Sequence, residues 1–382
     1  MLQPLPDPGP EAHAHSQSVL AHIRTAIAAE GGFLSFDRYM ELALYAPGLG
    51  YYAAGAHKFG ADGDFVTAPG LTPLFGQTLA DTLAPVLIET NGNLLELGAG
   101  EGRLAADILN TLGNAVAARY HILEVSADLR DRQYQYINTH AKTHLEKVVW
   151  LDTLPDHFSG VILANEVLDA LPVSLVHWHG TELFERGVCL EEGRMAWGER
   201  PLKQGPLFDA AQSLGIARTA FTSEISLAVP ALVSTLSERL THGAILLIDY
   251  GFTQSEYYHT ERHEGTLMCH YRHLAHTDPL LWPGITDITA HVDFSTVAMA
   301  GLKAGCDLLG YTSQTGFLLG AGILNRLNAL EPGSKAYLRA ASALQKLLQP
   351  SEMGELFKVI GLGRGLKCQI SGFSMGNRSH AL

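Results

Sequence analysis

The apolar residues of this chain recur at two spacings, one typical of helices and one typical of buried strands. Helical spacing predicts helices at 18–30, 36–44 and 78–88, the first of which stops at a Gly-Gly pair. Short apolar runs predict buried strands at 93–97, 121–125, 148–151, 160–164 and 244–249. Because helical stretches separate these strands, we expect an α/β, Rossmann-like fold with a mostly parallel sheet and helices on both faces.

Glycine and proline divide the chain of 382 residues into three expected regions. Residues 1–77 form an N-terminal cap, with a loose leader over 1–15, two helices and a Gly-rich loop. Residues 78–250 form the cofactor-binding core, with a polar hairpin or insertion at about 186–215. Residues 251–382 supply a substrate-side excursion and a C-terminal portion that completes the sheet.

A strand, a glycine turn and a helix start follow one another at 94–104. Gly98, Gly100 and Gly102 let the backbone turn sharply and approach a ligand, and the helix N-terminus offers free N–H donors. Glu124 ends the next apolar strand, where a carboxylate binds ribose hydroxyls in this architecture. The turn alone is equally compatible with a plain strand-to-helix connection.

Two features of the turn favour a sulfonium cofactor over a dinucleotide. The turn reads G-x-G-x-G instead of G-x-G-x-x-G, and Glu96 in the preceding strand would attract a cationic amino acid and repel a pyrophosphate. We therefore predict S-adenosyl-L-methionine as the cofactor. Asp152, at the end of the third strand, is placed either to accept the adenine amino group or to lie in a surface loop.

Polar residues directly follow the fourth apolar strand, at the edge of a parallel sheet where ligands bind. Asn165 is expected on the cofactor side, and Glu166 and Asp169 are candidates to orient or deprotonate an amine-type acceptor. A cap or turn residue is the alternative for Asp169. Asp249 ends another apolar strand, and it either orients the acceptor or anchors a loop.

The segment GDFVTAP at 63–69 carries many distinct side chains in a short stretch. We interpret it as a lid in which Asp64 and Thr67 contact the cofactor. A well-packed surface loop is the alternative.

The composition and charge of the chain limit the kinds of molecule that it is expected to bind. Apolar residues make up 47% of the chain, enough for a sizeable core, and the net charge of -13 argues against nucleic acid and suits a basic protein. The four cysteines form no C-x-x-C pair, and the histidines at 270, 273 and 276 lack a tight chelating pattern, so no metal site is predicted. Without a basic-then-apolar signal segment or a membrane-length apolar run, we expect a cytoplasmic protein with no membrane insertion.

Eight motifs spread over most of the chain resemble those of the MidA-like methyltransferases. They are GYY at 50–52, GDFVT at 63–67, ELGAG at 96–100, EVS at 124–126, NEVLDALP at 165–172, DYG at 249–251, DITAHVDF at 287–294 and MGELFK at 353–358. The resemblance implies a class I methyltransferase fold with S-adenosyl-L-methionine at the Gly98 turn. The family includes a mitochondrial arginine methyltransferase that assists complex I assembly, which implies a protein substrate with an accessible arginine, such as a respiratory complex subunit.

The resemblance also brings in His291, because it lies within the DITAHVDF motif. This histidine is a candidate for the acceptor pocket, with a buried core histidine as the alternative. Two other functions stay open. One is a flavin or nicotinamide oxidoreductase, against which Glu96 and Glu101 weigh, and the other is a cofactor-binding assembly chaperone without turnover. The sequence indicates neither the oligomeric state nor the identity of the acceptor.

Overall fold

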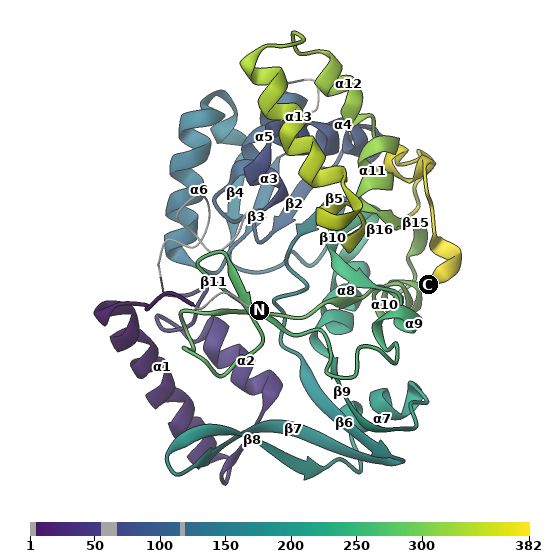
Figure 1. The fold of residues 1–382 in the computed structure, drawn as a ribbon. Helices are drawn as coiled ribbons and strands as arrows, with labels where there is room; N and C mark the ends of the chain where they lie inside the picture. The colour runs from purple at the N-terminus through teal and green to yellow at the C-terminus, as the bar shows by residue number, and fades with distance from the viewer. Residues whose placement is uncertain (1–4, 55–66, 115–118) are drawn as a thin grey trace. The chain divides into compact units, whose positions relative to one another are not determined.

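The computed structural model describes residues 5–54, 67–114 and 119–382 (Figure 1). They form two compact units, each assembled from three separate segments of the chain. The larger unit comprises Val66–Leu168, Pro230–Gln254 and Val292–Leu382. The smaller unit comprises Met1–Phe65, Asp169–Val229 and Ser255–His291.

The larger unit is built on an eight-stranded sheet in the described part of the chain. Its strands are β2 (Asn93–Leu97), β3 (Tyr120–Leu123), β4 (Val148–Leu151), β5 (Phe158–Asn165), β10 (Leu240–Phe252), β14 (Val292–Asp293), β15 (Asp307–Ser313) and β16 (Phe357–Arg364). The order is β15-β16-β10-β5-β2-β3-β4, with β14 beside β10. The strands from β10 to β4 are parallel, and β16 runs antiparallel to both of its neighbours. This confirms the predicted α/β fold with a mostly parallel sheet.

The strand order reverses between β2 and β5. From β2 the chain continues outwards to β3 and β4, and then returns to β5 on the other side of β2. Ligands of such sheets bind outside the carboxyl ends of the strands at this reversal point. The glycine turn after β2 and the polar residues after β5 both lie there.

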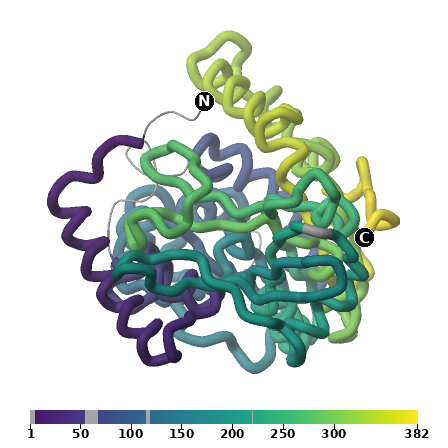
Figure 2. Tube along the Cα trace, turned by 60° about the horizontal axis from the view of Figure 1, so that its bottom comes forward, coloured from purple at the N-terminus to yellow at the C-terminus, as the bar shows by residue number. Residues whose placement is uncertain are grey.

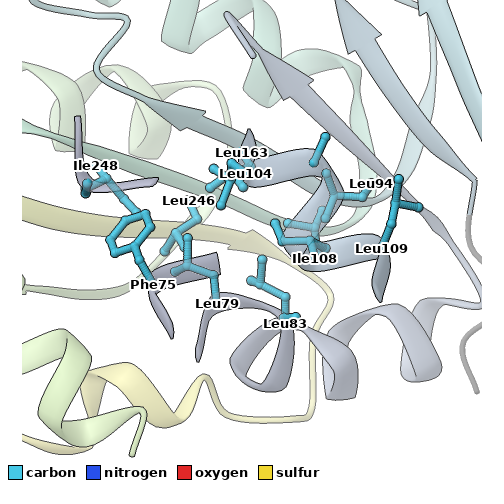
Figure 3. Packing of buried hydrophobic residues seen from close by; sticks show 14 of the residues in the cluster. Phe75, Leu79, Leu83, Leu94, Leu104, Ile108, Leu109, Leu163, Leu246 and Ile248 are labelled. Carbon is cyan, nitrogen blue, oxygen red and sulfur yellow. The ribbon is translucent and has the colours of Figure 1, made fainter. Parts of the chain in front are cut away.

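Helices cover both faces of this sheet. They are α3 (Ala68–Leu71), α4 (Pro73–Thr90), α5 (Arg103–Leu112), α6 (Ala127–His140), α10 (Phe294–Lys303), α11 (Gln314–Gly320), α12 (Ile323–Asn328) and α13 (Lys335–Leu348). On one face, side chains of α4 and α5 pack against Leu94, Leu163 and Leu246 of the strands (Figure 3). On the other face, Leu95 and Ile162 are equally buried, which explains why these strands are continuous apolar runs.

The smaller unit has two antiparallel sheets. The five-stranded sheet contains β1 (Phe33–Ser35), β6 (Ser174–Gly180), β7 (Glu182–Glu191), β8 (Arg194–Pro201) and β9 (Arg218–Ile225). The three-stranded sheet contains β11 (Met268–Tyr271), β12 (Leu274–His276) and β13 (Asp287–Thr289). Helices α1 (Pro10–Ala29) and α2 (Phe36–Tyr45), purple in Figure 2, pack along β7, and α7 (Pro206–Ser213) contacts β9. Helices α8 (Ala228–Arg239) and α9 (Gln254–Tyr257) lie where the chain passes between units.

The structure differs from the sequence predictions in two ways. Helix α1 begins at Pro10, inside the leader expected to be loose over 1–15, because proline is well suited to the first turn of a helix. The compact units also do not follow the expected boundaries 1–77, 78–250 and 251–382. The insertion expected at 186–215 is the middle of the longer segment Asp169–Val229, whose half-exposed strands leave only a weak apolar pattern.

Candidate active site

The structure divides the predicted site residues between the two units. The larger unit holds Thr67, Glu96, Gly98, Gly100, Gly102, Glu124, Asp152, Asn165, Glu166 and Asp249. Asp169 and His291 belong to the smaller unit. Asp64 lies outside the described residues.

The three glycines of the turn after β2 all have a positive φ, of 63° at Gly98, 51° at Gly100 and 85° at Gly102. A Cβ on Gly98 would lie 2.9 Å from Val167 Cγ2, in the loop after β5. A Cβ on Gly102 would lie 3.2 Å from the Cα of Gln133, whereas a Cβ on Gly100 would meet nothing within 4 Å. The turn therefore packs tightly at both ends and has open space in the middle, which fits the close approach of a ligand.

Glu96 is a buried carboxyl group within β2. Its Oε2 accepts a hydrogen bond of 2.8 Å from the hydroxyl of Tyr120 in β3. Burial raises the pKa of Glu96 to about 7, against the opposing effect of that hydrogen bond. A cation bound beside this carboxylate would favour its charged form, which is consistent with an ammonium or sulfonium ligand.

Glu124 lies directly after β3, and its carboxylate is oriented from two sides. Its Oε1 accepts from the backbone N–H of Ser126 at 2.9 Å, and its Oε2 accepts from Gln133 Nε2 at 3.0 Å. Burial raises the pKa of Glu124, and both hydrogen bonds oppose that rise. The next residue, Val125, is 84% exposed, so a carboxylate and an unpacked apolar side chain adjoin at this strand end, as a ribose and its base would require.

Asp152 follows β4 and forms an ion pair with Arg130 of α6, with 2.8 Å between its Oδ1 and the guanidinium. The Asp152 side chain is 88% exposed. The same guanidinium group of Arg130 donates to the backbone oxygens of Glu124 and Leu151, at the ends of β3 and β4. The contact of Asp152 with adenine stays a prediction, because the carboxylate already has this partner at the surface.

Glu166 follows β5 directly and has a left-handed backbone conformation, with φ of 56°. Its N–H donates to the carbonyl of Ile248 in β10 at 2.9 Å. Its Oε1 accepts from Asn165 Nδ2 at 3.0 Å and from the N–H of Ala68 at 3.4 Å. A non-glycine residue in this region is strained by about 1–3 kcal/mol, and such residues cluster at functional sites.

Asp249 holds the loop that contains Glu166. Its carboxylate is fully buried, and its Oδ2 accepts from the N–H groups of Val167 at 3.1 Å and Leu168 at 2.9 Å. Its Oδ1 accepts from the N–H of Tyr250 at 2.9 Å. Of the two roles that the sequence leaves open for Asp249, these contacts favour the loop anchor. Thr67 is the N-cap of α3 and forms no side-chain cap hydrogen bond there.

Asp169 and His291 lie close together within the smaller unit. The N–H of Ala290 donates to the carbonyl of Asp169 at 3.0 Å, and the N–H of His291 donates to Thr266 Oγ1 at 3.1 Å. Asp169 is buried. The four predicted acceptor-side residues thus fall into two pairs, Glu166 with Asp249 in one unit and Asp169 with His291 in the other.

Sequence reasoning missed Gln133, Tyr120 and Val125. Gln133 is detectable in principle, because it occupies a buried position of α6 four residues from Leu129 and four from Ile137. A polar residue at an apolar position of a helix indicates a specific partner.

Among the described residues, no group of three or more His, Cys, Asp or Glu side chains is arranged to hold a metal ion. Within the same ranges, every helix is too short or too polar to cross a bilayer.

Comparison with known proteins identifies the fold and the cofactor. A family model described as "Putative S-adenosyl-L-methionine-dependent methyltransferase" matches residues 75–312. The protein arginine methyltransferase NDUFAF7, mitochondrial, of Danio rerio is 30% identical, over 90% of this chain and 86% of its own length. The Homo sapiens protein of that name is 29% identical, over 90% and 83%. A Burkholderia thailandensis protein crystallised with S-adenosyl-homocysteine is 46% identical, with a TM-score of 0.95 over 99% of this chain and 100% of its own.

One prediction is overturned by these comparisons. The expected cytoplasmic location is wrong, because the curated relatives are named as mitochondrial proteins. The sequence argument tested only for a secretory signal and a membrane span, and neither feature separates the cytoplasm from the interior of an organelle.

The family match covers more than half of the chain, and it agrees with the strand order and with the glycine turn at the reversal point. The chain therefore belongs to this family of S-adenosyl-L-methionine-dependent methyltransferases, with a class I methyltransferase fold and S-adenosyl-L-methionine as its cofactor.

Proposed function

We propose that this protein methylates the guanidinium group of an arginine side chain in a protein substrate. The observation that carries the proposal is the carboxylate of Glu166, which stands on a strained left-handed backbone at the reversal point of the sheet and precedes Val167, the residue that packs against Gly98. The curated relatives at about 30% identity over most of the chain are named protein arginine methyltransferases. Neither the family nor these relatives support the oxidoreductase interpretation.

The residues at this edge fit the cofactor. The glycine turn offers close backbone approach, Glu96 offers a buried carboxylate for a cationic group, and Glu124 offers an oriented carboxylate for ribose hydroxyls. Asp152 is the remaining candidate, for the adenine amino group. When bound, S-adenosyl-L-methionine supplies an electrophilic methyl group on a positively charged sulfur.

Glu166 is the residue we expect to act on the acceptor. A guanidinium group stays protonated in water, with a pKa above about 12, so its nitrogen becomes nucleophilic only as a proton is lost. A carboxylate that accepts an N–H of the guanidinium both orients it and favours removal of that proton. Asn165 and the N–H of Ala68 hold Oε1 of this carboxylate in place, which reduces the reorganisation needed. Asp169 and His291 are proposed as further acceptor-side residues.

The charge of the chain supports a basic substrate. The net charge of -13 produces a field that attracts arginine-rich segments and repels nucleic acid. We extend the proposal to a respiratory complex subunit as the acceptor, following the family resemblance.

The test measures product on arginine directly. The purified protein is incubated with methyl-labelled S-adenosyl-L-methionine and with paired peptides that contain either arginine or lysine in the same basic context. We expect methylarginine, detected by mass spectrometry, from the arginine peptides alone. The Glu166→Gln variant should lose about a hundredfold or more in rate yet still bind S-adenosyl-homocysteine, and the exposed Glu331→Gln variant should match the unaltered protein.

Other outcomes would redirect the proposal. Label on lysine or on a non-protein acceptor would exclude arginine as the substrate residue. Binding of S-adenosyl-homocysteine with no methylated product from any basic protein mixture would support the assembly chaperone without turnover.

A further inference from the structure

Gln133 is a fully buried amide that the mechanism above does not use. It lies on the buried face of α6, between Leu129 and Ile137 at spacings of four residues. A buried amide without partners is costly, so the contacts of this side chain report why it is there.

The Gln133 side chain connects three successive strand ends. Its Nε2 donates to the carbonyl of Gly100 in the glycine turn at 3.0 Å and to Glu124 Oε2 after β3 at 3.0 Å. Its Oε1 accepts from the indole Nε1 of Trp150 in β4 at 2.9 Å. One amide therefore joins the turn after β2, the carboxylate expected to bind ribose, and the strand whose end is expected to lie near adenine.

These partners require an amide in one orientation. The indole of Trp150 can only donate, and the Gly100 carbonyl and the ionised Glu124 carboxylate can only accept. A glutamate at position 133 would place a negative charge against Glu124, and a methionine of similar size would satisfy none of the three groups. Among side chains of this size, glutamine is therefore the one whose donors and acceptor match these three partners.

The glycine turn also packs closely against the backbone of Gln133. A Cβ on Gly102 would lie 3.2 Å from Gln133 Cα and 3.4 Å from its carbonyl oxygen. The turn thus contacts position 133 twice, once through the Gly100 carbonyl and once through the close approach of Gly102.

We propose that Gln133 is a positioning residue for the cofactor, which fixes the glycine turn, the Glu124 carboxylate and the Trp150 indole relative to one another. This inference rests on the placement of the cofactor at this edge in the function proposed above. The hydrogen bond from Gln133 favours the ionised form of Glu124 and opposes the effect of burial on the pKa of that group. Loss of the amide should therefore change both the strength and the pH dependence of cofactor binding.

The test is calorimetric titration of the full chain with S-adenosyl-homocysteine, which binds without turnover, at a series of pH values. Gln133→Met removes all three hydrogen bonds at nearly constant volume, and Gln135→Met makes the same substitution at an exposed position of α6. We expect Kd to rise about tenfold or more for Gln133→Met and to be unchanged for Gln135→Met. As the pH falls, Gln133→Met should lose affinity at a higher pH than the unaltered protein, because Glu124 protonates earlier. The charged groups that face Glu124, Arg130 of α6 and Glu96 of β2, are the same in both proteins.

A Kd within about twofold of the unaltered protein and an unshifted pH profile would overturn the proposal. If Gln133→Met fails to fold, Trp150→Phe decides the question, since it removes the indole donor together with part of the ring and leaves the Gln133 amide in place. That variant should weaken binding in the same direction but by a smaller factor, and unchanged binding would overturn the proposal. Because the readout involves no acceptor, failure on arginine peptides leaves this test intact. Absence of S-adenosyl-homocysteine binding by the unaltered protein would overturn both.

Discussion

The left-handed backbone of Glu166 allows its proposed catalytic role to be separated from its effect on stability. In that region a Cβ costs about 1–2 kcal/mol relative to glycine. Glu166→Gly and Glu166→Ala both remove the carboxylate, so they differ only in this term. We expect Glu166→Gly to be more stable than Glu166→Ala by about 1 kcal/mol in urea unfolding, while both lack methyl transfer.

The matched pair at Gln135 should show the opposite order. Gln135 lies exposed within α6, where glycine is less favourable than alanine by about 1 kcal/mol. If Glu166→Ala were as stable as Glu166→Gly, the strain assigned to this residue would be absent.

A buried carboxyl group in β2, Glu96, and a half-buried one in α5, Asp107, predict how stability depends on pH. Burial raises the pKa of Glu96 to about 7, and burial likewise raises that of Asp107 in α5 to about 7. In the unfolded chain such groups titrate near about 4. Between these values the folded state binds more protons, so the free energy of unfolding falls as the pH rises. The contribution is fully present below about pH 4 and lost above about pH 7.

Glu96→Gln should flatten this dependence. At about 1.4 kcal/mol per pKa unit, the unaltered protein should lose a few kcal/mol more than Glu96→Gln between pH 5 and pH 8. Urea unfolding followed by circular dichroism at both pH values measures the difference. The exposed Glu331→Gln variant is the control and should follow the unaltered protein. Parallel curves for Glu96→Gln and the unaltered protein would show that Glu96 does not titrate in this range.

At the scale of elements, the β2–α5 turn combines a packing glycine with a glycine that faces open space. Gly102→Ala would push a methyl group against the backbone of Gln133, whereas Gly100→Ala would place it where nothing lies within 4 Å. Both substitutions carry the strain of a positive φ, but only Gly102→Ala adds a tight contact that the backbone of Gln133 must shift to accommodate. We expect Gly102→Ala to be the less stable variant by about 1–3 kcal/mol.

The two variants should reverse their order in a binding assay. Gly100→Ala should be well folded yet bind S-adenosyl-homocysteine more weakly, because its methyl group enters the space expected for the ligand. Equal stability of the two variants would contradict the packing described at Gly102. Unimpaired binding by Gly100→Ala would show that the ligand does not occupy the space beside Gly100.

Elements of the larger unit were predictable because their patterns are strong. The strand at 93–97 is β2 to the residue, and the strand at 148–151 is β4, since each apolar run ends abruptly at a glycine or an aspartate. In the smaller unit the sequence predicts only a hairpin or insertion at about 186–215, without strand bounds. Strand β8, within that range, has no buried residue, so the alternation between a core face and a solvent face is too weak to define its ends.

The site was predictable where a residue type implies a ligand, and unpredictable where its partner is a protein group. The glycines and Glu124 follow from the spacing of a known architecture. Gln133 contacts three segments that lie up to 33 positions from it in sequence, and the spacing of its own helix does not indicate them. The anchoring of Leu168 by Asp249 spans 81 positions, and only the pairing of β5 with β10 brings these residues together.

At the scale of the whole molecule, the interleaved units predict that the region 78–250 cannot fold by itself. It lacks β15 and β16, so β10 would lose the antiparallel partner with which it pairs over eight residues, from Gly243 to Tyr250. It would also retain Asp169–Val229 without the rest of the smaller unit. We expect the fragment 78–250 to show no cooperative thermal unfolding in circular dichroism, in contrast to the full chain. A sharp transition for the fragment would restore 78–250 as an independent domain.

The place of β16 has a consequence for the synthesis of the protein on the ribosome. This strand is the last one in the described chain, yet it lies between β10 and β15 in the interior of the sheet. During translation at about 5–20 residues per second, β10 emerges more than a hundred residues before the strand that will cover its edge. For those several seconds the nascent chain presents an unpaired apolar edge, and a stop codon anywhere before β16 would make that exposure permanent. Chaperone binding should therefore concentrate on nascent chains that end between β10 and β16.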